Sequence, residues 1–156
     1  MGFSRPAGGR RSTGQALLVM GCVVLAACAA AVAEGERAEP DPELLASSLE
    51  VEVRADSVRL ALHVTNTADR AMRLDFPSGQ RYDFAVHTPD GRELWRWSAD
   101  RAFTQAVGSE VLEAQGTVTY RASWAPPVRD GDLIAVAELV ASNAPLRRET
   151  RFQLRG

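Results

Sequence analysis

The sequence predicts an all-β fold, an immunoglobulin-like antiparallel β-sandwich of about seven to nine strands. Three observations favour it: beyond residue 48 apolar residues alternate with polar or small ones, turn-forming residues interrupt the alternation at regular intervals, and no helical period follows. Alternation with period two is typical of antiparallel strands that bury one face. A small β-barrel is the main alternative.

The composition sets the size of this fold. The chain has 156 residues, of which 46% are hydrophobic and 24% are charged, as expected for one globular domain with an appendage. We expect a signal segment over residues 1–27, a flexible tether over 28–47 and the β-sandwich domain over 48–156. All 18 basic residues are arginines, which excludes enzymes that use a Schiff-base or phosphate-binding lysine.

The N-terminal segment has the pattern of an export signal. Residues 1–33 contain three arginines and no acidic residue, and an apolar run rich in small residues extends from Ala16 to Ala33. The core of this run is about 12 residues long, shorter than the roughly 20 that a membrane-spanning helix needs. We therefore expect the segment to be removed after synthesis.

Two cleavage sites compete, and they predict different locations. Leu25-Ala26-Ala27-Cys28 resembles a bacterial lipobox, in which Cys28 is lipidated and becomes the new N-terminus. We favour this site because the cysteine stands where the apolar core ends, and it predicts a membrane-anchored lipoprotein of the cell envelope. The alternative site, Ala31-Val32-Ala33, predicts a soluble periplasmic or secreted protein that starts at Glu34.

The residues after Cys28 are rich in alanine, glutamate and proline and predict a tether between membrane and domain. Loss of residues 1–27 removes three arginines and leaves 15 arginines against 20 acidic residues. This balance argues against nucleic acid or anionic lipid as a ligand of the domain. The domain also has no cysteine of its own, so its stability depends on an apolar core and not on disulfides.

The predicted strands and turns follow from the alternation. Leu49 to Val53 and Val58 to Val64 are the first two strands, joined by a turn. Pro89-Asp90-Gly91 is the clearest hairpin signal, because proline presets φ and glycine accepts the left-handed conformation. It predicts that residues 82–87 pair with residues 92–97.

No set of residues predicts catalysis, a metal or a cofactor. His63 and His87 are the only histidines, both fall on polar strand faces, and the domain has no cysteine to complete a zinc site. The chain has no Gly-x-Ser-x-Gly elbow and no glycine-rich phosphate loop. Carboxylates such as Asp75 and Asp83 are expected to be solvated or paired with arginines.

Aromatic residues are concentrated in one part of the chain. Six of the ten lie between residues 76 and 103. Trp95 and Trp97 point to one face of their predicted strand and are expected to fill the core; exposed rings would instead indicate a recognition surface. Arg96, between them, is expected to pair with Asp83 across the hairpin or to stack on a ring.

Three loops are candidate partner-binding sites, because a sandwich of this kind presents its function on loops. Each could equally be an ordinary connection. The candidate residues are Pro77, Ser78, Gly79 and Gln80 in the first loop, Ser98, Asp100 and Arg101 in the second, and Pro126, Pro127 and Arg129 in the third.

The aromatic region resembles a known family. Leu74 to Phe84, then Trp95-Arg96-Trp97-Ser98, then Phe103-Thr104-Gln105 match the pattern L-x-F-x-S-G-Q-x-Y-D-F, W-R-W-S and F-x-Q of the BsuPI-type domain, named for an intracellular proteinase inhibitor. The motif core comprises Phe76, Tyr82, Phe84, Trp95, Trp97 and Phe103. The chain departs from the pattern after Gly131, where Leu133 and Ile134 stand in place of an aromatic residue.

The resemblance implies a non-catalytic domain that binds a protein, with a serine protease as the partner to be inhibited. The family label says intracellular, whereas the chain carries an export signal, so we expect the partner in the envelope or outside the cell. The alternative is an envelope interaction or structural module with no inhibitory activity.

Overall fold

The computed structural model describes residues 41–127 and 129–155, all of them within one compact unit. The predicted signal segment, Cys28 and most of the tether lie outside the described residues. The described part contains one short 3-10 turn and nine strands: η1 Pro42–Leu44, β1 Leu45–Val53, β2 Val58–Asn66, β3 Met72–Phe76, β4 Tyr82–His87, β5 Glu93–Arg96, β6 Gly108–Leu112, β7 Thr117–Trp124, β8 Gly131–Leu139 and β9 Leu146–Leu154.

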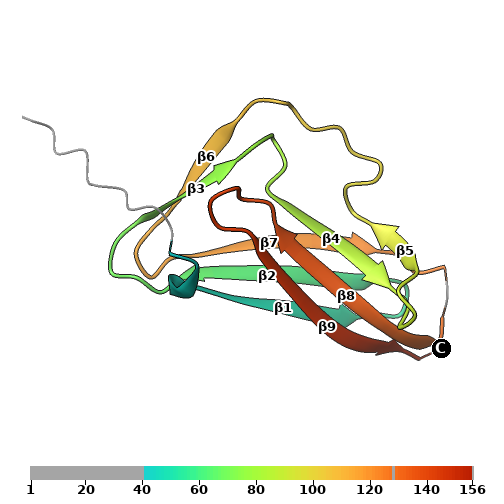
Figure 1. The fold of residues 1–156 in the computed structure, drawn as a ribbon. Helices are drawn as coiled ribbons and strands as arrows, with labels where there is room; N and C mark the ends of the chain where they lie inside the picture. Colours follow the sequence, from blue (N-terminus) through green and yellow to red (C-terminus); the bar gives the residue numbers. More distant parts are fainter. Residues whose placement is uncertain (1–40, 128, 156) are drawn as a thin grey trace, which may run out of the picture. The chain divides into compact units, whose positions relative to one another are not determined.

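The strands form two main layers, as the sequence predicts. One sheet has the order β1-β2-β7 and the other the order β5-β4-β8-β9, while β3 and β6 form a separate pair; every pairing is antiparallel. Figure 1 shows β4, β8 and β9 lying across β1, β2 and β7. The all-β prediction is confirmed, and an immunoglobulin-like sandwich is consistent with this strand order.

The core lies between the two layers. On β2 every second residue is buried, beginning at Val58, while the residues between them face outward. The opposite layer contributes buried side chains from β4 and β8. Strand β8 lies between β4 and β9, and it is buried on both faces near its centre. The largest fully buried apolar side chains are Phe76, Phe84, Leu60, Leu62, Met72, Leu74, Leu139, Val58, Val64 and Val86.

The first strand begins earlier than the alternation indicates. Leu45 pairs with Asn66 and is buried, so β1 starts four residues before the predicted Leu49. Ser47 and Ser48 stand in the strand without contributing to an apolar pattern, which hides its first half in the sequence. The last residues assigned to the tether are therefore part of the sheet.

The β4–β5 hairpin forms at the predicted turn. The N–H of Gly91 donates to the carbonyl of Thr88 at 2.9 Å, and Gly91 has a φ of 90°, a conformation that favours glycine. The pairing shifts register between Val86 and His87 and then continues through Trp95 and Arg96. The predicted partners are thus confirmed, with a bulge beside the turn.

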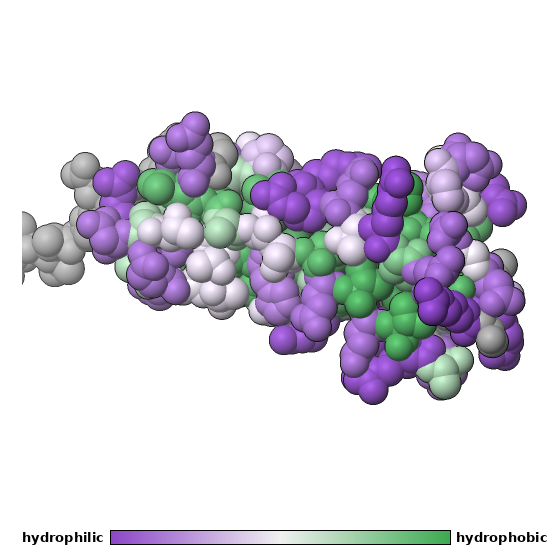
Figure 2. All heavy atoms as spheres, turned by 90° about the horizontal axis from the view of Figure 1, so that it is seen from below, coloured by the Kyte–Doolittle hydropathy of each residue, from purple (hydrophilic) through white to green (hydrophobic). Residues whose placement is uncertain are grey.

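The seam between β1 and β9 is closed by side chains. The Arg148 side chain donates to the carbonyl oxygen of Ser47, and the Thr150 hydroxyl donates to that of Leu49, each at 3.3 Å. These bonds occupy backbone acceptors on the edge of β1. Figure 2, seen from the side of β1 and β9, shows hydrophilic residues with hydrophobic ones between them.

The Asn66 side chain joins two turns of the chain at the end of β2. Its side chain is completely buried, and its Nδ2 donates to the carbonyls of Arg70, Leu112 and Glu113 at 2.7, 3.1 and 3.0 Å. Its Oδ1 accepts the N–H of Ala68 at 2.9 Å. A buried amide with these partners fixes the turn after β2 against the turn after β6.

We predict that Asn66→Asp lowers the free energy of unfolding by about 3–5 kcal/mol, because a buried carboxylate would face three carbonyl oxygens. Asp69→Asn makes the reverse change on an exposed residue of the same turn and should alter stability by no more than about 0.5 kcal/mol. Urea unfolding measures both. Equal effects of the two substitutions would show that the Asn66 amide has no special role.

Candidate functional site

The buried carboxylate of Asp83 links the first two of the three segments that carry the family pattern. Only 5% of Asp83 is exposed. Its Oδ2 accepts from an Arg96 guanidinium nitrogen at 2.9 Å and from the Ser98 hydroxyl at 2.7 Å, and its Oδ1 accepts the N–H groups of Phe84 and Ser98 at 2.9 and 3.1 Å. The predicted Arg96–Asp83 pair is confirmed, and Ser98 is a partner that the sequence did not indicate.

Arg96 is held by a second carboxylate. Its Nε and Nη2 donate to Glu93 at 3.0 and 2.7 Å. The hydrogen bonds to Glu93 and then to Asp83 raise the pKa of Arg96 above its ordinary value. The guanidinium is therefore fixed between two strands and is not available to a partner.

The two tryptophans differ from the expectation that they fill the core. Trp95 and Trp97 are only half-buried and pack against the edge of the core. The reason is their position on or beside β5, the edge strand of its sheet, which no further strand covers. The completely buried aromatic side chains are instead Phe76 and Phe84.

Half-buried rings pack on one another and on the buried rings of Tyr120 and Trp124 of β7, and we call this set of rings the aromatic cluster. Tyr82 lies 4.3 Å from Trp97 and 4.8 Å from Tyr120 between ring centroids. Trp97 lies 5.7 Å from Phe103, and Trp95 stacks near the buried Trp124 at 6.2 Å. Burial raises the pKa of the Tyr82 phenol, and the charge of Arg101 opposes that shift.

The first and second candidate loops lie together. The N–H of Gly79 donates to the carbonyl of Thr104 at 2.8 Å. A Cβ on residue 79 would stand 2.6 Å from the Thr104 hydroxyl oxygen, so any larger residue would force Thr104 to shift. The structure thus brings residues 77–80 beside residues 98–104.

Arg81 holds the first loop through a hydrogen bond to its backbone. Its Nη1 donates to the carbonyl of Ser78 at 2.7 Å, and its Nε pairs with Glu110 at 2.6 Å. The guanidinium carbon also lies 4.5 Å from the centre of the Phe76 ring. This arginine was not predicted as a site residue, although it stands inside the family pattern.

The second loop is held by the aromatic cluster. Arg101 places its guanidinium 4.2 Å from the centre of the Trp97 ring, and its Nε donates to the Trp97 carbonyl at 3.0 Å. Phe103 is half-buried, whereas residues 104–107 are exposed and outside any strand. Val107 is 79% exposed. The loop therefore combines fixed anchors with an exposed stretch that follows them.

The third candidate loop lies elsewhere. Pro126 and Arg129 line a small hollow with residues of the β1–β2 turn and the end of β9, while Pro127 is exposed. Figure 1 shows this region near the C-terminal end of the chain, away from the β3–β4 connection. The structure does not join it to the other two loops.

A groove follows the aromatic cluster along its exposed side. It is lined by Tyr82 of β4, by residues 95–97 and 100–101, and by residues 121–123 of β7. We call it the aromatic groove. Sequence reasoning missed it, because β7 is distant in sequence from the aromatic motif.

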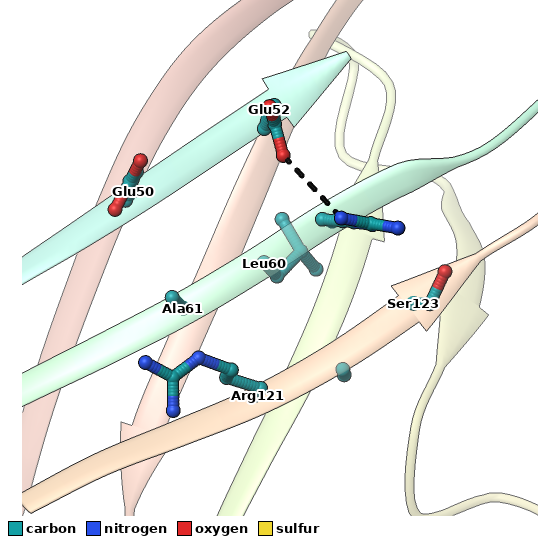
Figure 3. A pocket seen from close by; sticks show the side chains of 8 residues that line it. Glu50, Glu52, Leu60, Ala61, Arg121 and Ser123 are labelled. Atoms are coloured by element: carbon teal, nitrogen blue, oxygen red, sulfur yellow. Dashed lines mark ion pairs between the residues drawn. The ribbon is translucent and has the colours of Figure 1, made fainter. Parts of the chain in front are cut away.

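The histidines lie outside this region. His63 is on the outer face of the β1-β2-β7 sheet, where its Nδ1 is 3.0 Å from the Thr119 hydroxyl and its Nε2 is 3.3 Å from Glu50. Figure 3 shows the neighbouring hollow, where the small Ala61 stands between Glu50 and Arg121. Over residues 41–127 and 129–155, no three histidine, cysteine, aspartate or glutamate side chains are grouped to hold a metal ion.

The helix content of the described residues is small. Across those same ranges no helix is long and apolar enough to cross a membrane.

The fold and these contacts define an all-β domain that presents two joined loops and an aromatic groove. The chain belongs to the BsuPI family, described as intracellular proteinase inhibitor, whose model matches residues 45–144. The resemblance seen in the sequence is thereby confirmed, and membership fits a domain that binds a protein and is not an enzyme. Comparison with curated proteins gave no significant match.

Three solved structures illustrate a distant similarity. A penta-heme cytochrome c552 from Thermochromatium tepidum has a TM-score of 0.47 and 11% identity, over 72% of this chain and 40% of that one. The putative ApaA protein from Bordetella pertussis has a TM-score of 0.37 and 12% identity, over 70% and 89% of the two chains. A β-glucosidase from Erythrobacter marinus has a TM-score of 0.36 and 19% identity, over 70% and 16%. No functional conclusion follows from similarity at this level.

We predict that Asp83→Asn destabilises the domain by about 2–4 kcal/mol and changes tryptophan fluorescence, because the new amide presents a donor to Arg96 or Ser98. Glu93→Gln changes the second carboxylate that pairs with Arg96, which is more exposed than Asp83, and should change stability by about 0–1 kcal/mol. Unfolding in urea, followed by fluorescence, compares them. A larger effect at Glu93 would contradict the central role of Asp83.

Proposed function

We propose that this protein is a non-catalytic, protein-binding inhibitor of a proteinase, and that the joined loops 77–80 and 98–104 form its contact surface. The observation that carries the proposal is the direct bond from the Gly79 N–H to the Thr104 carbonyl, which ties the loops to each other. Family membership supports a protease as partner.

Rigidity is the physical argument for these loops. A segment that already holds its bound conformation loses little entropy when it enters a protease cleft. Arg81 holds the first loop through Ser78, and Arg101 and Phe103 hold the second against Trp97. Residues 104–107, which follow Phe103 and adjoin this surface, are exposed and accessible to a partner.

The proposal extends to the location of the protein. The lipobox-like sequence before Cys28 supports export and a lipid anchor, with the domain on the aqueous side of a membrane. The inhibited protease would then be a serine protease of the envelope or outside the cell. The second candidate, an interaction module without inhibitory activity, keeps the same fold and location.

We predict that the purified protein inhibits at least one member of a panel of subtilisin-like and trypsin-like proteases at one-to-one stoichiometry. Replacing residues 99–102 by Gly-Ser removes Arg101 but spares Ser98 and Phe103, and should weaken inhibition by about 100-fold or more. Residual protease activity against inhibitor concentration gives both values.

The matched control replaces residues 126–129 by Gly-Ser in the third loop, and should leave inhibition unchanged. Digestion of the protein, or no effect on any protease of the panel, would favour the non-inhibitory module. Equal losses from the two replacements would argue against the joined loops as the contact surface.

We predict that the mature protein begins at a diacylglycerol-modified Cys28 and partitions into detergent. Cys28→Ser removes the acceptor thiol and should shift the protein to the aqueous phase. Mass spectrometry of the N-terminal peptide and phase partitioning measure these outcomes. An unmodified N-terminus at Glu34 would contradict the lipoprotein assignment and support the soluble exported form.

A further inference from the structure

The edge of β7 is open beside the aromatic groove. Within the described residues β7 has a strand partner only on its β2 side. The N–H of Asn66 donates to the carbonyl of Gly116, so the backbone groups of every second residue from there, including those of Ala122, face β2. The backbone groups of Arg121 and Ser123 therefore face the opposite way, toward the groove.

A contact from the other side of the groove agrees with this orientation. The Tyr82 hydroxyl donates to the carbonyl of Arg121 at 3.4 Å, a long bond that places this carbonyl on the outward edge. The N–H groups of Arg121 and Ser123 lie on that same edge. An extended peptide beside β7 would find backbone donors there in the spacing of a β-ladder.

The groove carries positive charge beside its rings. Arg101 and Arg121 are exposed, and in the described part of the chain neither takes part in an ion pair. Arg96, by contrast, is neutralised by Asp83 and Glu93. Asp100 is the one acidic residue among those that line the groove. The two guanidinium groups without an ion pair, those of Arg101 and Arg121, therefore outnumber it.

The two faces of an added strand would meet different surfaces. Side chains alternate along a strand, so those on one face would lie on the half-buried rings of Tyr82 and Trp95. Those on the other face would lie beside Arg121, whose side chain stands on the outer face of its sheet (Figure 3). Apolar residues suit the first face and carboxylates the second.

We propose that the aromatic groove binds an extended acidic segment of a partner protein, which adds to the edge of β7 as a further strand. Apolar residues of that segment alternate with glutamate or aspartate, the former on the rings and the latter beside Arg121. Inhibition of a protease by the joined loops is a separate activity, and the groove does not depend on it.

The test uses the full protein, purified after export, and a fluorescein-labelled eight-residue peptide of alternating glutamate and valine. We expect saturable binding by fluorescence polarisation, with a change in tryptophan emission. Arg121→Gln should weaken binding about three- to fivefold, as loss of an exposed charge contact would. Arg92→Gln, an exposed arginine at the β4–β5 turn, is the matched control and should leave binding unchanged.

Backbone pairing is tested on the peptide, so that no variant has to fold. Methylation of the peptide nitrogens along one edge should abolish binding, because those N–H groups pair with β7, whereas methylation along the other edge should not. A glutamine peptide should bind more weakly than the glutamate peptide. Arg121→Gln lies outside the joined loops, so its inhibition of proteases should match that of the unchanged protein.

Four results would overturn the proposal: no saturable binding of the glutamate peptide, equal binding after methylation of either edge, equal binding of the glutamine peptide, or equal effects of the Arg121 and Arg92 substitutions. Binding retained together with absent protease inhibition would leave the groove established and reject the proposed inhibitory function. The reverse result would reject the groove alone.

Discussion

The buried carboxylate of Asp83 is the constraint on which the functional face of this domain depends. A carboxylate removed from water is unfavourable unless charged and hydrogen-bonding partners surround it. Arg96 and Ser98 supply those partners, and they come from the segment that follows the neighbouring strand. Satisfying one side chain therefore fixes the start of the second loop against β4, and it sets the direction in which Trp95 and Trp97 leave the edge of the sheet.

The loops inherit their order from this arrangement. Trp97 provides the surface on which Arg101 and Phe103 rest, and the chain beyond them reaches Gly79. The residues of the family pattern thus contact one another in the folded domain. Gly79 permits the close approach of Thr104, the Trp97 ring supports the second loop, and Asp83 holds Arg96. Conserving the strands alone would not reproduce this surface.

The sequence predicted the layers well because alternation and turn residues are local signals. Pro89-Asp90-Gly91 encodes its hairpin within a few residues, and the predicted pairing was found. The early start of β1 was missed because Ser47 carries no apolar signal and the strand is defined by its pairing with β2. The Arg96–Asp83 pair could be inferred because a hairpin brings its two strands together.

The remaining site features depend on contacts across long stretches of sequence. The approach of Thr104 to Gly79, and of β7 to the aromatic rings, is determined by how the two sheets stack, which period and composition do not report. The half-burial of Trp95 likewise follows from the edge position of β5. The sequence does not indicate which strand lies at an edge, so the large ring was expected in the core. The predictions for Cys28 and the N-terminal segment concern residues outside the described structure and remain predictions.

The edge strands β1 and β7 differ in whether side chains already occupy their outward backbone groups. On the side of β1 and β9, Arg148 and Thr150 already occupy backbone acceptors, so a further chain would have to displace them. If the open edge of β7 binds one strand of a partner, the blocked edge of β1 cannot bind a further strand in the same way. Growth into ribbons or fibrils is thereby disfavoured, even at high concentrations of the domain.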